Sequence, residues 1–166
     1  LAGNPLAPEN LRREAAELGV APERIVFAPR AAFADHLARQ RLADLFLDTT
    51  PVNAHTTASD ALWVGLPVLT VAGSTFAGRV AGSLLHSLGL SELIATDLGD
   101  YERRADELIE RREARSRLRS RLETLRTTAR VFRGDLFARG VEAAYRRMWR
   151  LHVSGAGPQG FRVDEA

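Results

Sequence analysis

The chain contains no cysteine and no lysine. Without cysteine it can form no disulfide and offers no thiolate to a metal, and this composition favours a cytoplasmic location. Without lysine it has no P-loop lysine, Schiff-base lysine or lysine general base. Its 4 histidines are dispersed, and neither a paired-histidine spacing nor another metal-binding motif occurs, so we expect no metal site.

Long hydrophobic runs are also absent, since no segment approaches the roughly 18–20 apolar residues of a membrane span. We therefore expect no contact with a membrane. Neither sign of charge is in large excess, because the chain has 23 arginines and 21 carboxylates, which leave a net charge of +2. So small a net charge gives little long-range field, and aromatic residues do not interleave with the arginines. Nucleic-acid binding is therefore a weak alternative.

The chain has 166 residues, of which 45% are hydrophobic, enough for one buried core. Short apolar segments alternate with helical patterns over its first two-thirds. We predict strands at residues 25–27, 45–47, 68–71 and 93–95, and helices at residues 8–18, 35–43, 57–64 and 76–88. Gly19, Gly65 and Gly89 are the predicted helix stops. This alternation predicts an α/β fold, a Rossmann-like parallel sheet with helices on both faces.

An all-helical C-terminal segment follows. We predict a charged helix pair within residues 101–128 and a last helix at residues 135–152, whose packing stripe is Leu136, Val141, Ala144, Tyr145, Met148 and Leu151. The arginines of residues 103–133 predict either a basic patch for an acidic partner or solvated helices with internal ion pairs. The predicted organisation is a lobe at residues 1–98, helices packing on it at residues 99–153, and a loose tail at residues 154–166.

The most informative stretch is residues 48–60, which follows a predicted strand and opens a predicted helix. Ligands of open parallel sheets bind in such loops, and the unpaired N–H groups of a helix start suit a phosphate. Thr56 and Thr57 add hydroxyls there, and Asp60 lies one turn on, where its carboxylate could accept hydrogen bonds from a ribose. Ordinary helix capping explains the same residues equally well.

Two neighbouring strand-to-helix loops lie at the same predicted edge of the sheet. In the first, His36 and Arg39 could face a nucleoside, although a surface position explains His36 as well. In the second, Ser74 or Thr75 is expected to cap the following helix. Gly73 and Gly78 do not form the G-x-G-x-x-G fingerprint, so we expect no nicotinamide cofactor.

Several ordered segments resemble the protein O-GlcNAc transferase family, including its SPINDLY-type and bacterial members. They are RLADLFLD, NAHTT and DALWVGLPVLT at residues 41–48, 53–57 and 60–70, followed by RVA, LGLSELIA and YRRMW at residues 79–81, 88–95 and 145–149. The resemblance covers residues 10–149. It implies the C-terminal, nucleotide-sugar-binding lobe of a GT-B glycosyltransferase, lacking the first strand or strands of that lobe, with a first catalytic lobe and tetratricopeptide repeats ahead of it.

The implied activity is transfer of a sugar, GlcNAc from UDP-GlcNAc, to Ser or Thr of an acceptor protein, with inversion and without a metal or other cofactor. The resemblance puts His36 and Arg39 at the uridine, Thr56 and Thr57 at the diphosphate, His55 near the sugar and Asp60 at the ribose. The catalytic base is not identified. The isolated chain is expected to be inactive, because the implied active site lies between two lobes.

One departure from the family pattern concerns the uracil. Phe33 stands where the family has a lysine, and the guanidinium of Arg30 does not reproduce an ammonium group. Two alternatives remain open for the chain as a whole. One is a non-catalytic protein-interaction fragment, and the other is a nucleotide-sugar epimerase of the same fold.

Overall fold

The computed structural model describes residue 4 and residues 6–163. The chain forms two compact units, residues 1–39 and residues 40–166, which are considered separately below. The outermost residues of the predicted lobe and tail, 1–3, 5 and 164–166, lie outside the described residues. None of the described helices is both long enough and apolar enough to cross a membrane.

The first unit is helical. It contains α1 (Leu6–Glu17), the short 3-10 helix η1 (Pro22–Arg24) and most of α2 (Phe33–Gln40). The strand predicted at residues 25–27 is wrong, since these residues form no strand, and Val26 is 82% exposed. The Arg12 guanidinium donates to the carbonyl oxygen of Ile25 instead. An apolar run forms a strand only when another strand takes up its backbone hydrogen bonds, and none among the described residues does so here.

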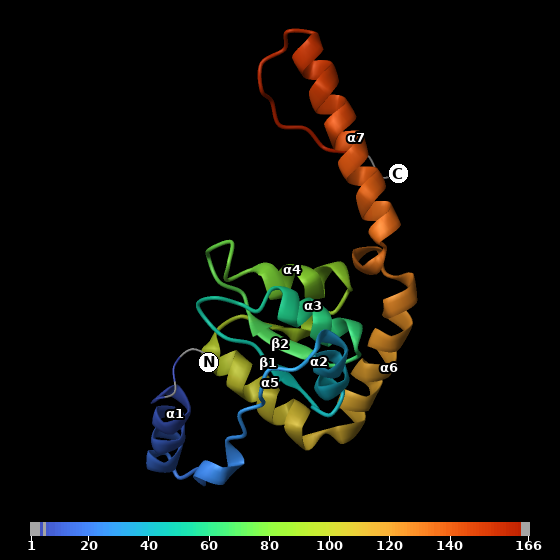
Figure 1. The fold of residues 1–166 in the computed structure, drawn as a ribbon. Helices are drawn as coiled ribbons and strands as arrows, with labels where there is room; N and C mark the ends of the chain where they lie inside the picture. Colours follow the sequence, from blue (N-terminus) through green and yellow to red (C-terminus); the bar gives the residue numbers. More distant parts are fainter. Residues whose placement is uncertain (1–3, 5, 164–166) are drawn as a thin grey trace. The chain divides into compact units, whose positions relative to one another are not determined.

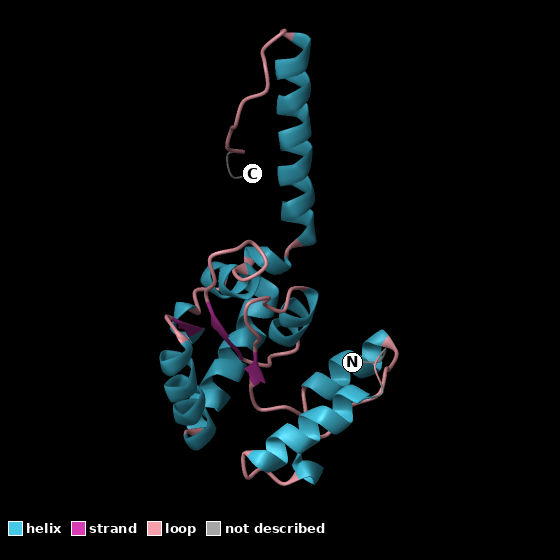
Figure 2. Cartoon of the chain, turned by 90° about the vertical axis from the view of Figure 1, so that its left-hand side faces the viewer, coloured by secondary structure: helices cyan, strands magenta, loops and turns pink. Residues whose placement is uncertain are grey.

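The second unit is built on a three-stranded parallel sheet in the order β1 (Phe46–Leu47), β2 (Val68–Val71) and β3 (Ile94–Ala95). Phe46 pairs with Val68, and Thr70 pairs with Ile94. In Figure 1, α3 (Thr56–Trp63) and α4 (Val80–Ser87) lie on one face of this sheet and α5 (Leu98–Glu110) on the other. The predicted α/β fold with helices on both faces is therefore confirmed, and Figure 2 shows how short its strands are beside the helices.

The core lies where these layers meet. Val68 and Leu69 of β2 are fully buried, as a central parallel strand with helices on both faces requires. Four more fully buried leucines come from α3, α4, the turn after α4 and α6 (Arg112–Thr128), and they are Leu62, Leu85, Leu90 and Leu122. Burial of each contributes roughly 1.5–3 kcal/mol, so this unit has a sizeable apolar core.

Glycines end the helices where the sequence predicts. After α3, Gly65 has φ +87°, and the amides of Gly65 and Leu66 donate to the carbonyls of Leu62 and Ala61. After α4, Gly89 has φ +67°, and the amides of Gly89 and Leu90 donate to the carbonyls of His86 and Leu85. This is the Schellman motif, which needs a left-handed residue that glycine supplies without steric cost. The helix stops fix the short turns into β2 and into the 3-10 helix η2 (Ser91–Leu93).

Arginines of α5 pair mainly within their own helix, whereas those of α6 bind other elements. Arg103 pairs with Asp100 and Glu107, three and four residues away on α5. From α6, the Arg119 guanidinium donates to the carbonyl oxygen of Ala43 at 2.7 Å, and Arg121 donates to that of Gly89. The pairs on α5 favour the interpretation as a solvated helix with internal ion pairs. The α6 contacts have a different, structural use, since guanidinium groups bind carbonyls left free at helix ends and turns.

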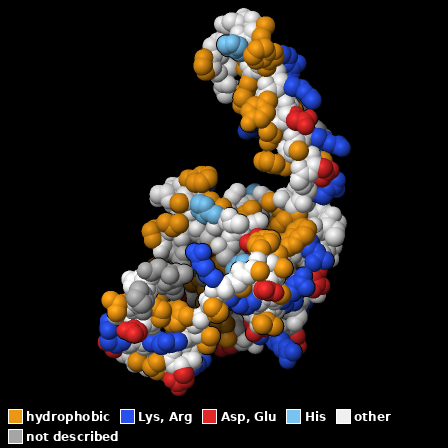
Figure 3. All heavy atoms as spheres, in the orientation of Figure 1, with side chains coloured by type: hydrophobic (Ala, Val, Ile, Leu, Met, Phe, Trp, Pro, Cys, Tyr) orange, Lys and Arg blue, Asp and Glu red, His pale blue; other side chains and the backbone are white. Residues whose placement is uncertain are grey.

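The last helix, α7 (Gly134–Val153), follows a short 3-10 helix, η3 (Arg130–Phe132). It is amphipathic as predicted, but none of its residues is buried among the described residues. Figure 3 shows hydrophobic side chains along one side of this helix and basic ones along the other. The exposed apolar residues include Phe137, Tyr145, Met148 and Trp149.

Candidate functional site

The start of α3 presents unpaired backbone donors. The helix follows β1 after an eight-residue loop, and its N-cap residue, His55, makes no side-chain capping hydrogen bond. Within the described part of the chain, the amides of Thr56, Thr57 and Ala58 donate to no acceptor, and the first amide with an intrahelical partner is that of Ser59. Thr56 and Thr57 are exposed. Capping therefore does not explain these threonines. All three amides are unpaired, and those of the exposed Thr56 and Thr57 are accessible to an anion.

Asp60 and His55 flank these amides in the sequence. Asp60 is half-buried on the second turn of α3. The His55 ring is exposed, with Nε2 at 3.3 Å from the carbonyl oxygen of Ala77. Its edge also meets the Phe76 ring, with 6.1 Å between centroids and an interplanar angle of 88°. The carbonyl can only accept, so this contact favours the tautomer of His55 that carries its proton on Nε2.

A buried carboxylate, Asp48, lies directly after β1 and is 6% exposed. Its Oδ1 accepts from the amides of Thr49 and Ala54 at 2.9 and 2.7 Å. Its Oδ2 accepts from the Thr70 hydroxyl at 2.6 Å, and its main-chain oxygen accepts from the Tyr101 hydroxyl at 2.9 Å. Burial raises the pKa of Tyr101, and the nearby negative charge of Asp48 adds to this effect. Asp48 was not among the residues predicted for the site.

The loop after β2, residues 72–79, packs against the loop after β1. The main-chain amide of Asn53 donates to the carbonyl oxygen of Ala77 at 2.9 Å. The prediction that Ser74 or Thr75 caps a helix beginning near residue 76 is wrong. Helix α4 begins at Val80 without a side-chain cap. The Thr75 hydroxyl accepts instead from the Gly78 amide at 3.1 Å and closes a turn within the loop.

His36 and Arg39 contact each other on α2. The Arg39 guanidinium donates to the carbonyl oxygen of Pro29 at 2.7 Å and lies 3.0 Å from Nδ1 of His36. A guanidinium has no acceptor, so Nδ1 of His36 is the accepting nitrogen and the ring proton lies on Nε2. Phe33, on the first turn of the same helix, is 65% exposed, and Arg30 is exposed as well.

The predicted site residues thus fall into two groups. His55, Thr56, Thr57 and Asp60 come together at the start of α3, and His36 and Arg39 come together on α2. The chain divides between Arg39 and Gln40, so the two groups belong to different units. That all six residues serve one ligand stays a prediction.

A parallel sheet covered by helices on both faces defines a Rossmann-like α/β protein, and in this one a helix start beyond a strand carries unpaired amides and exposed hydroxyls. The family model for glycosyl transferase family 41 matches residues 4–141. The chain belongs to this family, as the resemblance in its sequence implies.

Two curated relatives show the extent of the similarity. The chain is 39% identical over 155 residues to the probable UDP-N-acetylglucosamine–peptide N-acetylglucosaminyltransferase SEC of Arabidopsis thaliana, which covers 93% of this chain and 16% of that protein. It is 38% identical over 150 residues to the probable SPINDLY transferase of Oryza sativa subsp. japonica, covering 90% of this chain and 16% of that protein. The chain therefore spans about a sixth of these relatives' length.

A solved structure agrees with the fold. A mutant of Thermobaculum terrenum O-GlcNAc transferase superposes with a TM-score of 0.79 at 37% sequence identity. The match covers 89% of this chain and 28% of the solved chain. The helix start of α3 thus belongs to a segment that is shared, in sequence and in fold, with a sugar-transferring enzyme.

Proposed function

We propose that this chain forms the donor-binding part of an inverting glycosyltransferase that moves GlcNAc from UDP-GlcNAc to Ser or Thr of proteins. The observation that carries the proposal is the start of α3, where the amides of Thr56, Thr57 and Ala58 lack partners among the described residues and two exposed hydroxyls lie beside them. Its membership of glycosyl transferase family 41 supports the reaction class.

The chemistry of the leaving group explains why such a helix start is useful. As the bond between the sugar and the diphosphate breaks, negative charge grows on the departing UDP. N–H donors that are already oriented stabilise that charge more strongly in the transition state than in the ground state. Loss of one such donor costs about 3 kcal/mol of barrier in comparable sites. No metal or other cofactor is part of this proposal.

The remaining roles follow the family resemblance. We propose that Asp60 accepts hydrogen bonds from the ribose hydroxyls and that His55 lies near the sugar. We propose separately that His36 and Arg39 contact the uridine. The proposed partners are the acceptor protein, a first catalytic lobe and tetratricopeptide repeats, and no residue is assigned as the catalytic base. The cytoplasmic location expected from the cysteine-free sequence belongs to the same proposal.

One observation favours a second candidate, a non-catalytic fragment that binds other proteins. The apolar residues of α7 are exposed, and no α7 residue is buried among the described residues. Such a fragment has no need to bind a nucleotide, so UDP binding separates the two candidates. The epimerase alternative is not favoured by membership of a glycosyltransferase family.

The test is a titration of the ¹⁵N-labelled chain with UDP, in which calorimetry measures the affinity and NMR monitors the amide resonances. We expect saturable binding, with the amide resonances of Thr56, Thr57 and Ala58 shifting most among those of residues 40–166. Uridine, which lacks the diphosphate, serves as the ligand control and should leave these three resonances in place. Thr57→Val should weaken UDP binding, whereas Thr127→Val, which removes an exposed hydroxyl on α6, should not. Failure of UDP to bind, or shifts confined to other segments, would reject the proposal.

A further inference from the structure

The environment of Asp48 shows that its side chain serves the protein itself. The carboxylate is 6% exposed and already accepts from two backbone amides and one hydroxyl. A carboxylate with this many donors is well satisfied inside a protein, since hydrogen bonds to a charged acceptor are stronger than those between neutral groups. It is therefore not placed to bind a ligand directly.

The partners of Asp48 come from distant parts of the chain. Thr70 is a fully buried residue of β2, and its hydroxyl donates to Oδ2 of Asp48. Tyr101 belongs to α5, on the opposite face of the sheet from α3, and its hydroxyl donates to the main-chain oxygen of Asp48. The end of β1 is thereby tied to the neighbouring strand and to a helix that packs on β2 and β3.

The same carboxylate closes the loop that leads into α3. Oδ1 bridges the amides of Thr49 and Ala54, which stand at the two ends of that loop. Within the loop, the Asn53 side-chain amide donates to the carbonyl oxygen of Thr49 at 3.1 Å, and the Thr49 hydroxyl donates to that of Val52 at 2.9 Å. Ala54 is two residues before the first residue of α3. The position of the helix start therefore depends on where Asp48 holds Ala54.

We propose that Asp48, Thr70 and Tyr101 are positioning residues that hold residues 49–55 in place and so orient the free amides at the start of α3 for the donor diphosphate. This inference rests on the function proposed above and adds three residues that touch no ligand themselves. Orientation before binding matters because a loop that must be ordered on binding lowers the affinity by the cost of ordering it.

The experiment uses Thr70→Val and Tyr101→Phe, which remove one hydroxyl each and keep the shape of the side chain. We expect each variant to bind UDP about threefold to tenfold more weakly, the range that one hydrogen bond supplies. Amide hydrogen exchange at Thr49 and Ala54 should accelerate by a similar factor, with exchange at Leu69 in β2 unchanged. Thr70→Ser keeps the hydroxyl, so its UDP affinity and its hydrogen exchange at Thr49 and Ala54 should return to the wild-type values. Matched controls are Thr124→Val and Tyr145→Phe, both at exposed positions.

The two readouts separate the two proposals. A wild-type chain that does not bind UDP rejects the proposed function. Exchange at Thr49 and Ala54 needs no ligand, and unchanged exchange there in both variants rejects the positioning role whatever UDP does. A lower melting temperature with unchanged UDP affinity at a temperature where the variants are folded would show a merely structural role, and it would also overturn the inference.

Discussion

Gly78 lies directly against Pro51: a Cβ atom added to Gly78 would come within 2.8 Å of the main-chain oxygen of Pro51. The same added atom would lie 3.3 Å from Cα of Gly73. The contact joins the loop after β2 to the loop that leads into α3. Its tightness comes from crowding by backbone atoms, which cannot swing aside as a side chain can.

Gly78→Ala is therefore expected to lower the free energy of unfolding by about 1–3 kcal/mol, the usual cost of overpacking. Urea denaturation followed by circular dichroism measures this change. Gly140→Ala is the matched control, because an added Cβ at Gly140 on α7 meets no atom within 4 Å. This control should be neutral or gain up to about 1 kcal/mol from helix propensity. Equal stability of Gly78→Ala and the wild type would contradict the close contact.

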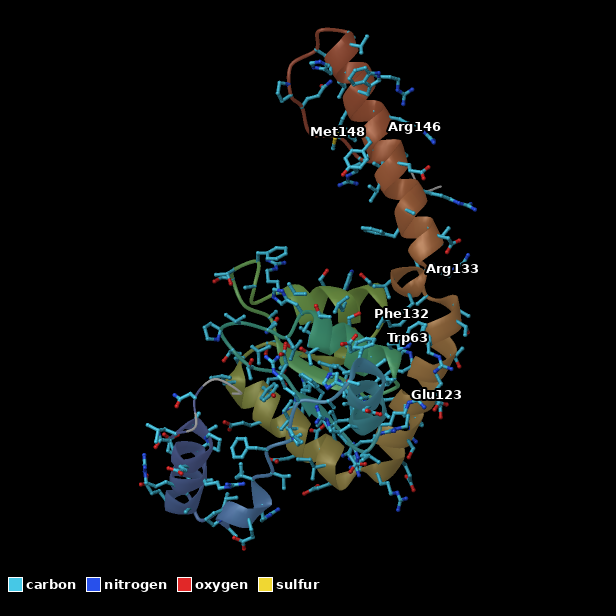
Figure 4. All side chains as sticks on the ribbon, viewed as in Figure 1. Trp63, Glu123, Phe132, Arg133, Arg146 and Met148 are labelled. Atoms are coloured by element: carbon cyan, nitrogen blue, oxygen red, sulfur yellow. The ribbon has the colours of Figure 1, made fainter. Side chains whose placement is uncertain are left out.

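An aromatic pair joins the end of α3 to η3. The rings of Trp63 and Phe132 meet edge to face, with centroids 5.3 Å apart and an interplanar angle of 72°. Figure 4 shows the two side chains next to each other, just before the chain enters α7. The Arg126 guanidinium also lies over the Trp63 ring, 5.8 Å from its centroid. Trp63 is 41% exposed, so burial alone does not account for its contribution.

A double-mutant cycle with Trp63→Leu and Phe132→Leu should give a coupling energy of about 0.5–1.5 kcal/mol, as expected for aromatic pairs. Chemical denaturation of the four proteins measures it. In the control cycle, Phe132→Leu is combined with Trp149→Leu, which changes an exposed residue on α7. A coupling energy near zero in both cycles would show that the ring contact does not stabilise the fold.

The carboxylate of Asp100 makes stability depend on pH in the acid range. Hydrogen bonds from the Arg104 side chain, then from the Thr96 amide, hold its pKa well below the ordinary value of 3.8, and Arg103 adds to the effect. Asp97 completes the arrangement, because its side chain accepts from the Asp100 amide at 2.8 Å and caps α5. The pairing thus belongs to the helix start that follows β3.

The sign of the pH effect follows from the lowered pKa. Above about pH 5 Asp100 is almost fully ionised in both the folded and the unfolded chain, and its stabilising contribution is nearly complete. As the pH falls below about 5, the unfolded chain takes up the proton first, so the contribution is progressively lost. Asp100→Asn should therefore be less stable than the wild type near pH 7, with the difference shrinking as the pH approaches the lowered pKa. Urea denaturation across this range tests it, with Asp106→Asn on the same helix as control, and a constant difference would contradict the assignment.

The proposed ribose contact predicts a specific loss for Asp60→Ala. Removal of a charged acceptor should weaken UDP binding about tenfold or more, since such hydrogen bonds contribute roughly 1.5–3 kcal/mol. Calorimetry with UDP and with its 2′-deoxy analogue measures the loss, which should be smaller for the analogue. Ser59→Ala, one residue earlier on α3 and also half-buried, controls for damage to the helix. Unchanged UDP affinity in Asp60→Ala would count against the ribose role.

Features encoded within a few residues could be predicted from the sequence. The strand at residues 68–71 and the helix stops at Gly65 and Gly89 agree with the structure because an apolar run and a glycine carry their own local signal. Residues 25–27 carry a similar apolar signal but form no strand, since a strand also depends on a partner that the run does not specify.

The candidate site shows the same limit. The exposure of Thr56 and Thr57 could be predicted because loops at strand ends and helix starts have general properties. The start of α4 could not, because the preceding turn is set by Thr75, Gly78 and the neighbouring loop. Asp48 was missed since its partners Thr70 and Tyr101 lie 22 and 53 residues away. The one local signal was an acidic residue directly after a short apolar run.

The three unpaired donors at the start of α3 are main-chain groups, so no substitution other than proline deletes them. An anchor of this kind is inherited with the backbone. At the proposed donor site, preference for one base or one sugar can then change at the surrounding side chains while the proposed phosphate contact is kept. Relatives that differ in donor could arise from the same framework by few substitutions.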